Sequence, residues 1–139
     1  MHASIIVKIL GILLILFSFL GNFPPWLVSL IYADGMASVF FYSFLIIFSA
    51  GAVLLLFTAR SRKELGTRDG FLVVTLFWVV LGTAGCLPFM LSSAVELSIT
   101  DAIFESLSGL TTTGATVISG LDDLPRSILF YRQLLQWLG

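Results

Sequence analysis

Two long stretches without a charged side chain constrain this sequence more than any other feature. They cover residues 35–59 and 70–95, and are 25 and 26 residues long. A helix rises about 1.5 Å per residue and the bilayer core is about 30 Å thick, so about 18 uncharged residues suffice to cross it. A soluble helical protein would need polar faces repeating along these stretches, and they have none. The sequence therefore predicts an all-α integral membrane protein.

Three membrane-spanning helices are expected, over about 5–32, 38–59 and 70–91. The low charged fraction agrees with this, since only 11% of the residues are charged, against about 25% in soluble domains. Pro24 and Pro25 lie inside the first expected helix and predict a kink or a break near Phe23. Pro88 should loosen the last turns of the third.

A basic linker between the second and third expected helices sets the orientation. Four of the seven Lys and Arg residues lie in 60–69, and cytoplasmic loops carry an excess of these residues. We therefore expect a multi-pass protein whose linker and N-terminus are cytoplasmic. Six of the eight acidic residues then fall on the outer side. They could form an acidic mouth that concentrates cations, or they could lie in ordinary solvated loops. All three tyrosines also fall near outer ends, as in an interfacial belt.

Composition and charge disfavour two classes of function. A nucleic-acid-binding protein would show a basic stripe, whereas the net charge is −1. An intramembrane enzyme would need a nucleophile or metal ligands inside its spans, but the expected spans contain no Asp, Glu or His. The single cysteine, Cys86, forms no internal disulfide and is interpreted as a small buried apolar residue. We expect neither an enzyme nor a nucleic-acid partner.

The segment after the third span combines a short helix with an irregular loop. Residues 97–110 carry apolar side chains at helical spacing, with Ser98 and Asp101 as N-cap and first-turn acid. At 14 residues this helix would be about 21 Å long, too short to span a bilayer. Residues 111–116 are poor helix material, and a new helix is expected over 125–139. The short helix should dip into the membrane and the loop should return to the same face.

A loop of this kind is typical of cation filters, in which backbone carbonyls replace the hydration shell of the ion. Irregular backbone at membrane depth persists only where protein or a water-filled path satisfies it. The negative C-terminal end of the short helix would favour a cation, and Gly114 would supply a backbone geometry closed to other residues. The alternative is a re-entrant or interfacial helix followed by a threonine-rich turn.

Arg132 is a charged residue placed about 10 Å along the last expected helix. A charge at that depth should be paired or should reach the interface. We expect Arg132 to pair with Glu105 or Asp101 and to support the loop from behind. The alternative is that its side chain extends to the outer interface.

Several stretches of the sequence carry a specific resemblance to one family. They are 101–117, 121–125 and 130–139, with further similarity at 68–78 and 30–35. In this order they resemble the Trk/Ktr potassium transporter family, over essentially the whole chain. The resemblance implies a fold with four repeats of helix, pore helix, filter loop and helix around one pore. Some members carry an additional helix pair in front, which the first two expected spans match.

By this resemblance the chain has two parts. Residues 1–66 correspond to an N-terminal two-helix membrane domain with a cytoplasmic linker, and 67–139 to a first pore repeat. The repeat would contain a helix over 70–91, a pore helix over 97–110, a filter loop over 111–116 and the start of a second helix over 125–139. That last helix, about 14 residues and 21 Å, does not finish a span. We therefore expect an N-terminal fragment of such a transporter, truncated in its second pore-lining helix.

The implied function is uptake of K⁺ across the bacterial inner (plasma) membrane. The residues expected to bind K⁺ through their carbonyls, as the first of four filter strands, are Thr111, Thr112, Thr113 and Gly114. The resemblance also implies a homodimer of the full-length protein and a cytosolic nucleotide-binding Trk regulatory subunit. No cofactor is expected, and coupling to H⁺ or Na⁺ stays open. The alternatives are a membrane assembly module without transport activity of its own and a small cation pore formed by several copies.

Overall fold

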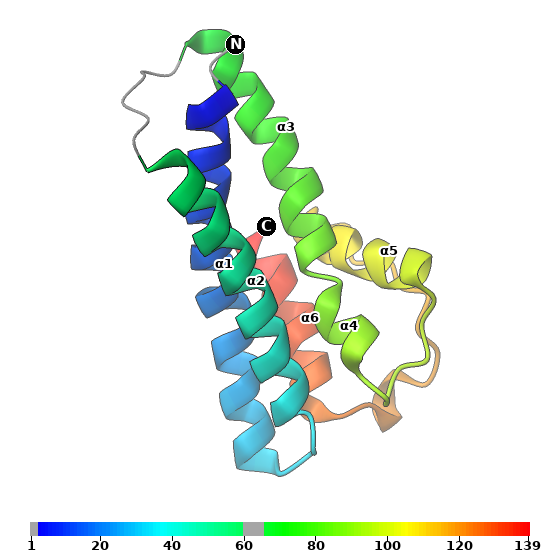
Figure 1. The fold of residues 1–139 in the computed structure, drawn as a ribbon. Coiled ribbons are helices and arrows are strands. Elements are labelled where there is room, and N and C mark those ends of the chain that lie inside the picture. Colours follow the sequence, from blue (N-terminus) through cyan, green and yellow to red (C-terminus); the bar gives the residue numbers. More distant parts are fainter. Residues whose placement is uncertain (1–2, 60–65) are drawn as a thin grey trace.

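The computed structural model describes residues 3–59 and 66–139, and this part of the chain is built from helices and loops (Figure 1). In chain order the elements are α1 (Ala3–Tyr32), α2 (Ala37–Thr58), α3 (Thr67–Ala84), α4 (Leu87–Leu91), α5 (Ile99–Leu110), the 3-10 turn η1 (Leu121–Asp123) and α6 (Arg126–Leu138). Three helical segments, 3–32, 37–58 and 67–91, are long and apolar enough to cross a membrane. The predicted all-α membrane fold is confirmed. Residues 60–65, which hold most of the basic linker, lie outside the described residues.

Helices α1 and α2 form an antiparallel pair joined by a tight turn (Figure 1). The turn is made by left-handed backbone at Ala33 and Gly35, with φ of 51° and 80°. The two helices approach closely at two glycines, because a Cβ on Gly51 would lie 2.8 Å from the carbonyl oxygen of Gly11. Small residues at such a crossing allow backbones in lipid to pack directly against each other.

The break that the sequence allowed near Phe23 does not occur. Helix α1 continues through Pro24 and Pro25 as one element of 30 residues. Each proline removes one backbone hydrogen bond from the helix. Neighbouring helices support such positions in membrane proteins, and Pro25 is buried. The prolines therefore lie inside a continuous span.

The third span, in contrast, is divided into α3 and α4 at Gly85 and Cys86. Pro88 has no N–H to bond the carbonyl four residues earlier, so the helix ends before it and restarts with Pro88 in the first turn of α4. The carbonyl of Gly85 accepts a hydrogen bond from the Tyr131 hydroxyl at 2.6 Å. The predicted loosening near Pro88 is thus a short break at Gly85 and Cys86, whose backbone stays right-handed helical, and Tyr131 of α6 bonds to the carbonyl of Gly85.

Tyr131 corrects one expectation from the sequence. Its side chain is 0% exposed, so it lies in the core and not in an interfacial belt. Its ring contacts Phe40 of α2 and Phe89 of α4, with centroids 5.6 and 5.3 Å away. Tyr131 therefore joins α6 to two other helices, and the hydrogen bond to Gly85 satisfies its hydroxyl inside this core.

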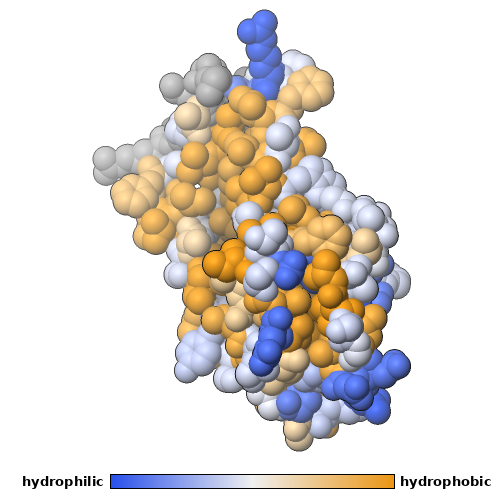
Figure 2. All heavy atoms as spheres, turned by 90° about the vertical axis from the view of Figure 1, so that its right-hand side faces the viewer, coloured by the Kyte–Doolittle hydropathy of each residue, from blue (hydrophilic) through white to orange (hydrophobic). Residues whose placement is uncertain are grey.

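Helix α6 packs between α1 and α5. Helix α5 also packs on α3 and α4 (Figure 1). Figure 2 shows that hydrophobic side chains cover most of the α5 side of the molecule, while hydrophilic ones gather mainly toward its two ends. This distribution is the one expected where lipid or further membrane helices surround a protein.

Candidate functional site

The short helix α5 begins with the predicted cap. The Ser98 hydroxyl accepts a hydrogen bond from the Asp101 N–H at 3.1 Å, and Asp101 lies in the first turn. The helix starts at Ile99, two residues later than predicted, because Ser98 is the cap itself. Its 12 residues make it about 18 Å long, too short to span. Close packing on α6 positions it, since a Cβ on Gly109 would lie 2.8 Å from Cβ of Leu135.

The loop after α5 bonds its amides back to the helix that precedes it. The N–H groups of Thr113 and Gly114 both donate to the Ser108 carbonyl, at 3.0 and 3.2 Å. The N–H of Thr112 donates to the Gly109 carbonyl at 2.8 Å. Within the described residues, no hydrogen bond is donated to the backbone carbonyls of 111–114, and these residues are exposed. The loop therefore presents a row of unused acceptors beside the negative end of a helix dipole.

Two residues in this loop have left-handed backbone, Thr112 with φ of 58° and Gly114 with φ of 72°. The geometry was expected at Gly114 but not at Thr112. A β-branched side chain disfavours it, and such strain persists only where the surroundings hold it. Here the Thr111 hydroxyl donates to the Leu107 carbonyl at 2.7 Å and lies 3.0 Å from that of Thr113. Nothing in the sequence pattern indicates the strain at Thr112.

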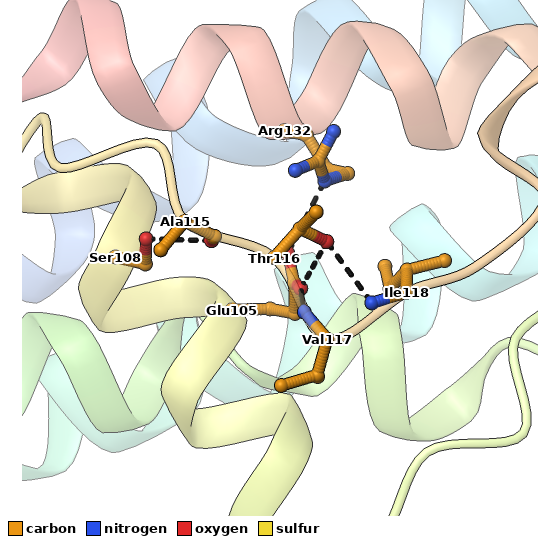
Figure 3. Close-up of polar contacts among 7 residues, drawn as sticks. All are labelled: Glu105, Ser108, Ala115, Thr116, Val117, Ile118 and Arg132. Atoms are coloured by element: carbon orange, nitrogen blue, oxygen red, sulfur yellow. Dashed lines mark hydrogen bonds and ion pairs between the residues drawn. The ribbon is translucent and has the colours of Figure 1, made fainter.

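Glu105 of α5 holds the strand that leaves the loop (Figure 3). Its Oε1 accepts hydrogen bonds from the Val117 N–H at 2.7 Å and from the Thr116 hydroxyl. Its Oε2 accepts a hydrogen bond from Nε of Arg132 at 3.2 Å. Nearby, the Ser108 hydroxyl donates to the Ala115 carbonyl at 2.7 Å. The backbone directly after 111–114 is thus tied to α5 by Ser108 and Glu105, and Glu105 is in turn paired with Arg132 of α6.

The environment of Arg132 shows whether its side chain is paired or extends to the outer interface. Arg132 is 8% exposed and Glu105 3%, so Arg132 does not extend to an interface. It pairs with Glu105, while in 3–59 and 66–139 no ion pair joins it to Asp101. Two charges removed from solvent need each other and further hydrogen bonds to be stable. Of the three residues expected to support the loop, Glu105 and Arg132 belong to one network, whereas Asp101 lies in the first turn at the far end of α5.

Asp34 is a polar residue whose role was not predicted. Its Oδ1 accepts hydrogen bonds from the Ser29 hydroxyl and from the Met36 N–H, the latter at 3.1 Å, and its Oδ2 accepts from the Ser127 N–H at 2.9 Å. Burial raises the pKa of this carboxyl, but the hydrogen bonds from Ser127, Ser29 and Met36 outweigh it and lower the pKa below the ordinary 3.8. Asp34 is therefore ionised at neutral pH. The only signal was its place in one of the stretches that carry the family resemblance.

The fold and the site together define a class of protein. Long apolar helices, followed by a short helix and an exposed loop with unbonded carbonyls, make a multi-pass helical membrane protein. A family model described as "TrkH: Cation transport protein" matches residues 36–139. The chain belongs to this family of cation transport proteins.

Individual relatives agree with the family. The Trk system potassium uptake protein TrkH of Halomonas elongata is 57% identical over 139 residues, and that of Salmonella typhimurium 53% over 140. Both matches cover 100% of this chain and 29% of the relative. The crystal structure of the potassium transporter TrkH from Vibrio parahaemolyticus superposes with a TM-score of 0.93 at 51% identity, over 99% of this chain and 29% of that one. The chain thus spans less than a third of the length of these relatives.

Proposed function

We propose that this chain supplies one strand of the selectivity filter of a potassium uptake transporter in the bacterial inner membrane. The observation that carries the proposal is the loop at 111–114, whose amides bond back to α5 while its carbonyls stay unbonded within the described residues. Carbonyls that are not used by the protein are available to replace the hydration shell of K⁺. Relatives named as potassium uptake proteins match the whole chain.

In this mechanism the carbonyls of Thr111–Gly114 coordinate a dehydrated K⁺. The C-terminal end of α5 points its partial negative charge at the same place. Glu105, held by Arg132, fixes the outgoing strand through Thr116 and Val117, so that the carbonyl spacing is set by buried contacts. One strand makes a quarter of a ring in the proposed fourfold arrangement, and the remaining strands come from further repeats.

Several finer points belong to the same proposal. Residues 1–66 make up an N-terminal two-helix membrane domain with a cytoplasmic linker, and 67–139 make up the first pore repeat, with the N-terminus in the cytoplasm. The full-length protein is a homodimer in the lipid bilayer and binds a cytosolic nucleotide-binding Trk regulatory subunit. The competing functions are an assembly module and a pore made from several copies of this chain.

The test uses a whole transporter. The segment of the Halomonas elongata relative that matches this chain is replaced by it, and the chimera is expressed in a bacterium that lacks K⁺ uptake systems. We expect the chimera to restore K⁺ uptake. Gly114→Val should then abolish uptake or its preference for K⁺ over Na⁺, because valine disfavours φ of 72°.

Gly70→Val is the matched control, since a Cβ at Gly70 meets nothing within 4 Å. It should leave uptake and selectivity unchanged. A Gly114→Val chimera that keeps both would overturn the filter assignment, and so would an unsubstituted chimera that reaches the membrane without transporting K⁺. K⁺ flux through vesicles that contain this chain alone would instead favour the pore of several copies.

A further inference from the structure

The Asp34 carboxylate connects two parts of the chain that are far apart in sequence. Asp34 lies in the turn between α1 and α2. Its Oδ2 accepts a hydrogen bond from the amide of Ser127, which is 93 positions away in the sequence. Ser127 is the second residue of α6. The other carboxylate oxygen of Asp34, Oδ1, accepts hydrogen bonds from Ser29 and Met36, which are close to it in the sequence. The carboxylate is therefore held by the helix pair and presented to the start of α6.

The start of α6 has no cap of its own. Its N-cap residue is Pro125, and no side chain of α6 caps it. The first amides of a helix lack intrahelical partners and carry partial positive charge, so a carboxylate from outside can bond and stabilise them. A second contact reinforces the first, because the Arg126 guanidinium lies 4.8 Å from the centroid of the Tyr32 ring. The helix pair thus caps a helix that belongs to the pore repeat.

A continuous path leads from this cap to the loop. Arg132 is five residues beyond Ser127 on the same helix, about 7.5 Å along its axis. Arg132 pairs with Glu105, and Glu105 accepts from Val117 just after the loop. A displacement of the start of α6 moves Arg132 with it, because a helix transmits such shifts as a rigid element.

From these contacts we infer that Asp34 is a positioning residue for the ion filter, which it aligns from outside the pore repeat by fixing the start of α6. The inference rests on the proposed function of the loop at 111–114. It gives the N-terminal helix pair a task in ion selection. A different reading treats Asp34 as one more acidic group that attracts cations to the outer face, and the two readings predict different results.

The first measurement is hydrogen–deuterium exchange on this chain in lipid nanodiscs. Asp34→Asn keeps the size of the side chain but loses its charge and one acceptor, leaving the Ser127 amide with a weakened cap. We expect the amides at the start of α6 to exchange about tenfold faster, as loss of an N-cap predicts. Asp122→Asn is the matched control. It removes the same charge from an exposed residue of η1 and should leave this exchange unchanged.

The second measurement is K⁺ and Na⁺ uptake by the same variants in the chimera. Asp34→Asn should reduce the K⁺/Na⁺ preference severalfold, and Asp122→Asn should not. Combined with Glu105→Gln and Arg132→Gln, Asp34→Asn should cause no further loss of preference, because the path is already broken. Unchanged exchange in Asp34→Asn overturns the cap. If Asp34→Asn and Asp122→Asn lose apparent K⁺ affinity equally and keep their selectivity, Asp34 attracts cations and does not position the filter.

Failure of the two proposals can be told apart. Exchange at the start of α6 reports on the cap and requires no transport. Gly114→Val reports on the filter and does not touch the cap. Faster exchange in Asp34→Asn together with full uptake in Gly114→Val would mean that the cap exists but that no filter lies at 111–114.

Discussion

Glu105 receives more of the polar contacts around the loop than any other side chain described in the site. Its two oxygens accept from Arg132, Val117 and Thr116, and it is almost completely buried. A buried carboxylate that loses its cation is left with an uncompensated charge, and removing one member of such a pair costs about 3–5 kcal/mol. Substitution of either partner should therefore cost more stability than the loss of its hydrogen bonds alone would.

The corresponding prediction concerns the pair. In the chimera, Glu105→Gln and Arg132→Gln should each lower K⁺ uptake and its selectivity strongly, since each leaves a buried charge unpaired. The double variant should lose much less than the sum of the two, because no unpaired charge remains. Uptake and thermal stability in detergent are measured for all four forms.

Asp101→Asn is the control for this cycle. It removes a carboxylate from the same helix, one turn before Glu105, and Asp101 has no ion pair with Arg132 among the described residues. It should leave uptake close to that of the unsubstituted chimera. Additive losses for Glu105→Gln and Arg132→Gln would show that the two residues act independently.

The residues of the site differ in how far the sequence reveals them. The pair of Glu105 and Arg132 can be expected from sequence because a charge in an apolar helix needs a partner. The cap by Asp34 joins residues 93 positions apart, and no periodicity relates them. The left-handed backbone at Thr112 is equally invisible, because it results from how the loop folds back onto α5.

At the scale of elements, the helix pair depends on close backbone contact. A Cβ at Gly51 would lie 2.8 Å from the Gly11 carbonyl oxygen and 3.1 Å from the Ile15 amide nitrogen. Both atoms belong to the backbone of α1 and cannot rotate away. Any side chain at Gly51 therefore forces the two helices apart.

Gly51→Ala should accordingly destabilise the chain, by about 1–3 kcal/mol as for other overpacked sites. The thermal unfolding temperature in detergent is the measurement. Gly70→Ala serves as the control because a Cβ at that position of α3 meets nothing. It should stabilise slightly, as alanine favours helix by about 1 kcal/mol over glycine. A stabilised Gly51→Ala variant would contradict the close crossing.

The elements themselves are largely predictable, because their signals are local. Charge-free stretches give the spans to within a few residues, and Ser98 and Pro125 mark the starts of α5 and α6. The separation of α3 from α4 is harder to foresee. It follows from Pro88, but its extent depends on Tyr131, which bonds the Gly85 carbonyl from a distant helix.

At the scale of the whole molecule, the expected orientation places Arg68 and Asp122 on opposite sides of the membrane. Both are exposed, and the single span 67–91 separates them along the chain. In a Cys86→Ser background, Asp122→Cys should react with a membrane-impermeant maleimide in intact cells. Arg68→Cys should react only after permeabilisation. The Cys86→Ser chain alone is the unlabelled control, and the reverse labelling pattern would refute a cytoplasmic N-terminus.

Helix α1 also relates the protein to the thickness of its membrane. Its 30 residues extend about 45 Å, whereas the hydrocarbon core is about 30 Å thick. Such a mismatch is relieved by tilting the helix or by thickening the lipid around it, at a modest free-energy cost for each ångström. Because the turn after α1 holds the start of α6, a change of tilt would be passed to α6. If the loop at 111–114 is the proposed filter, lipid chain length then becomes a mechanical input to ion selection.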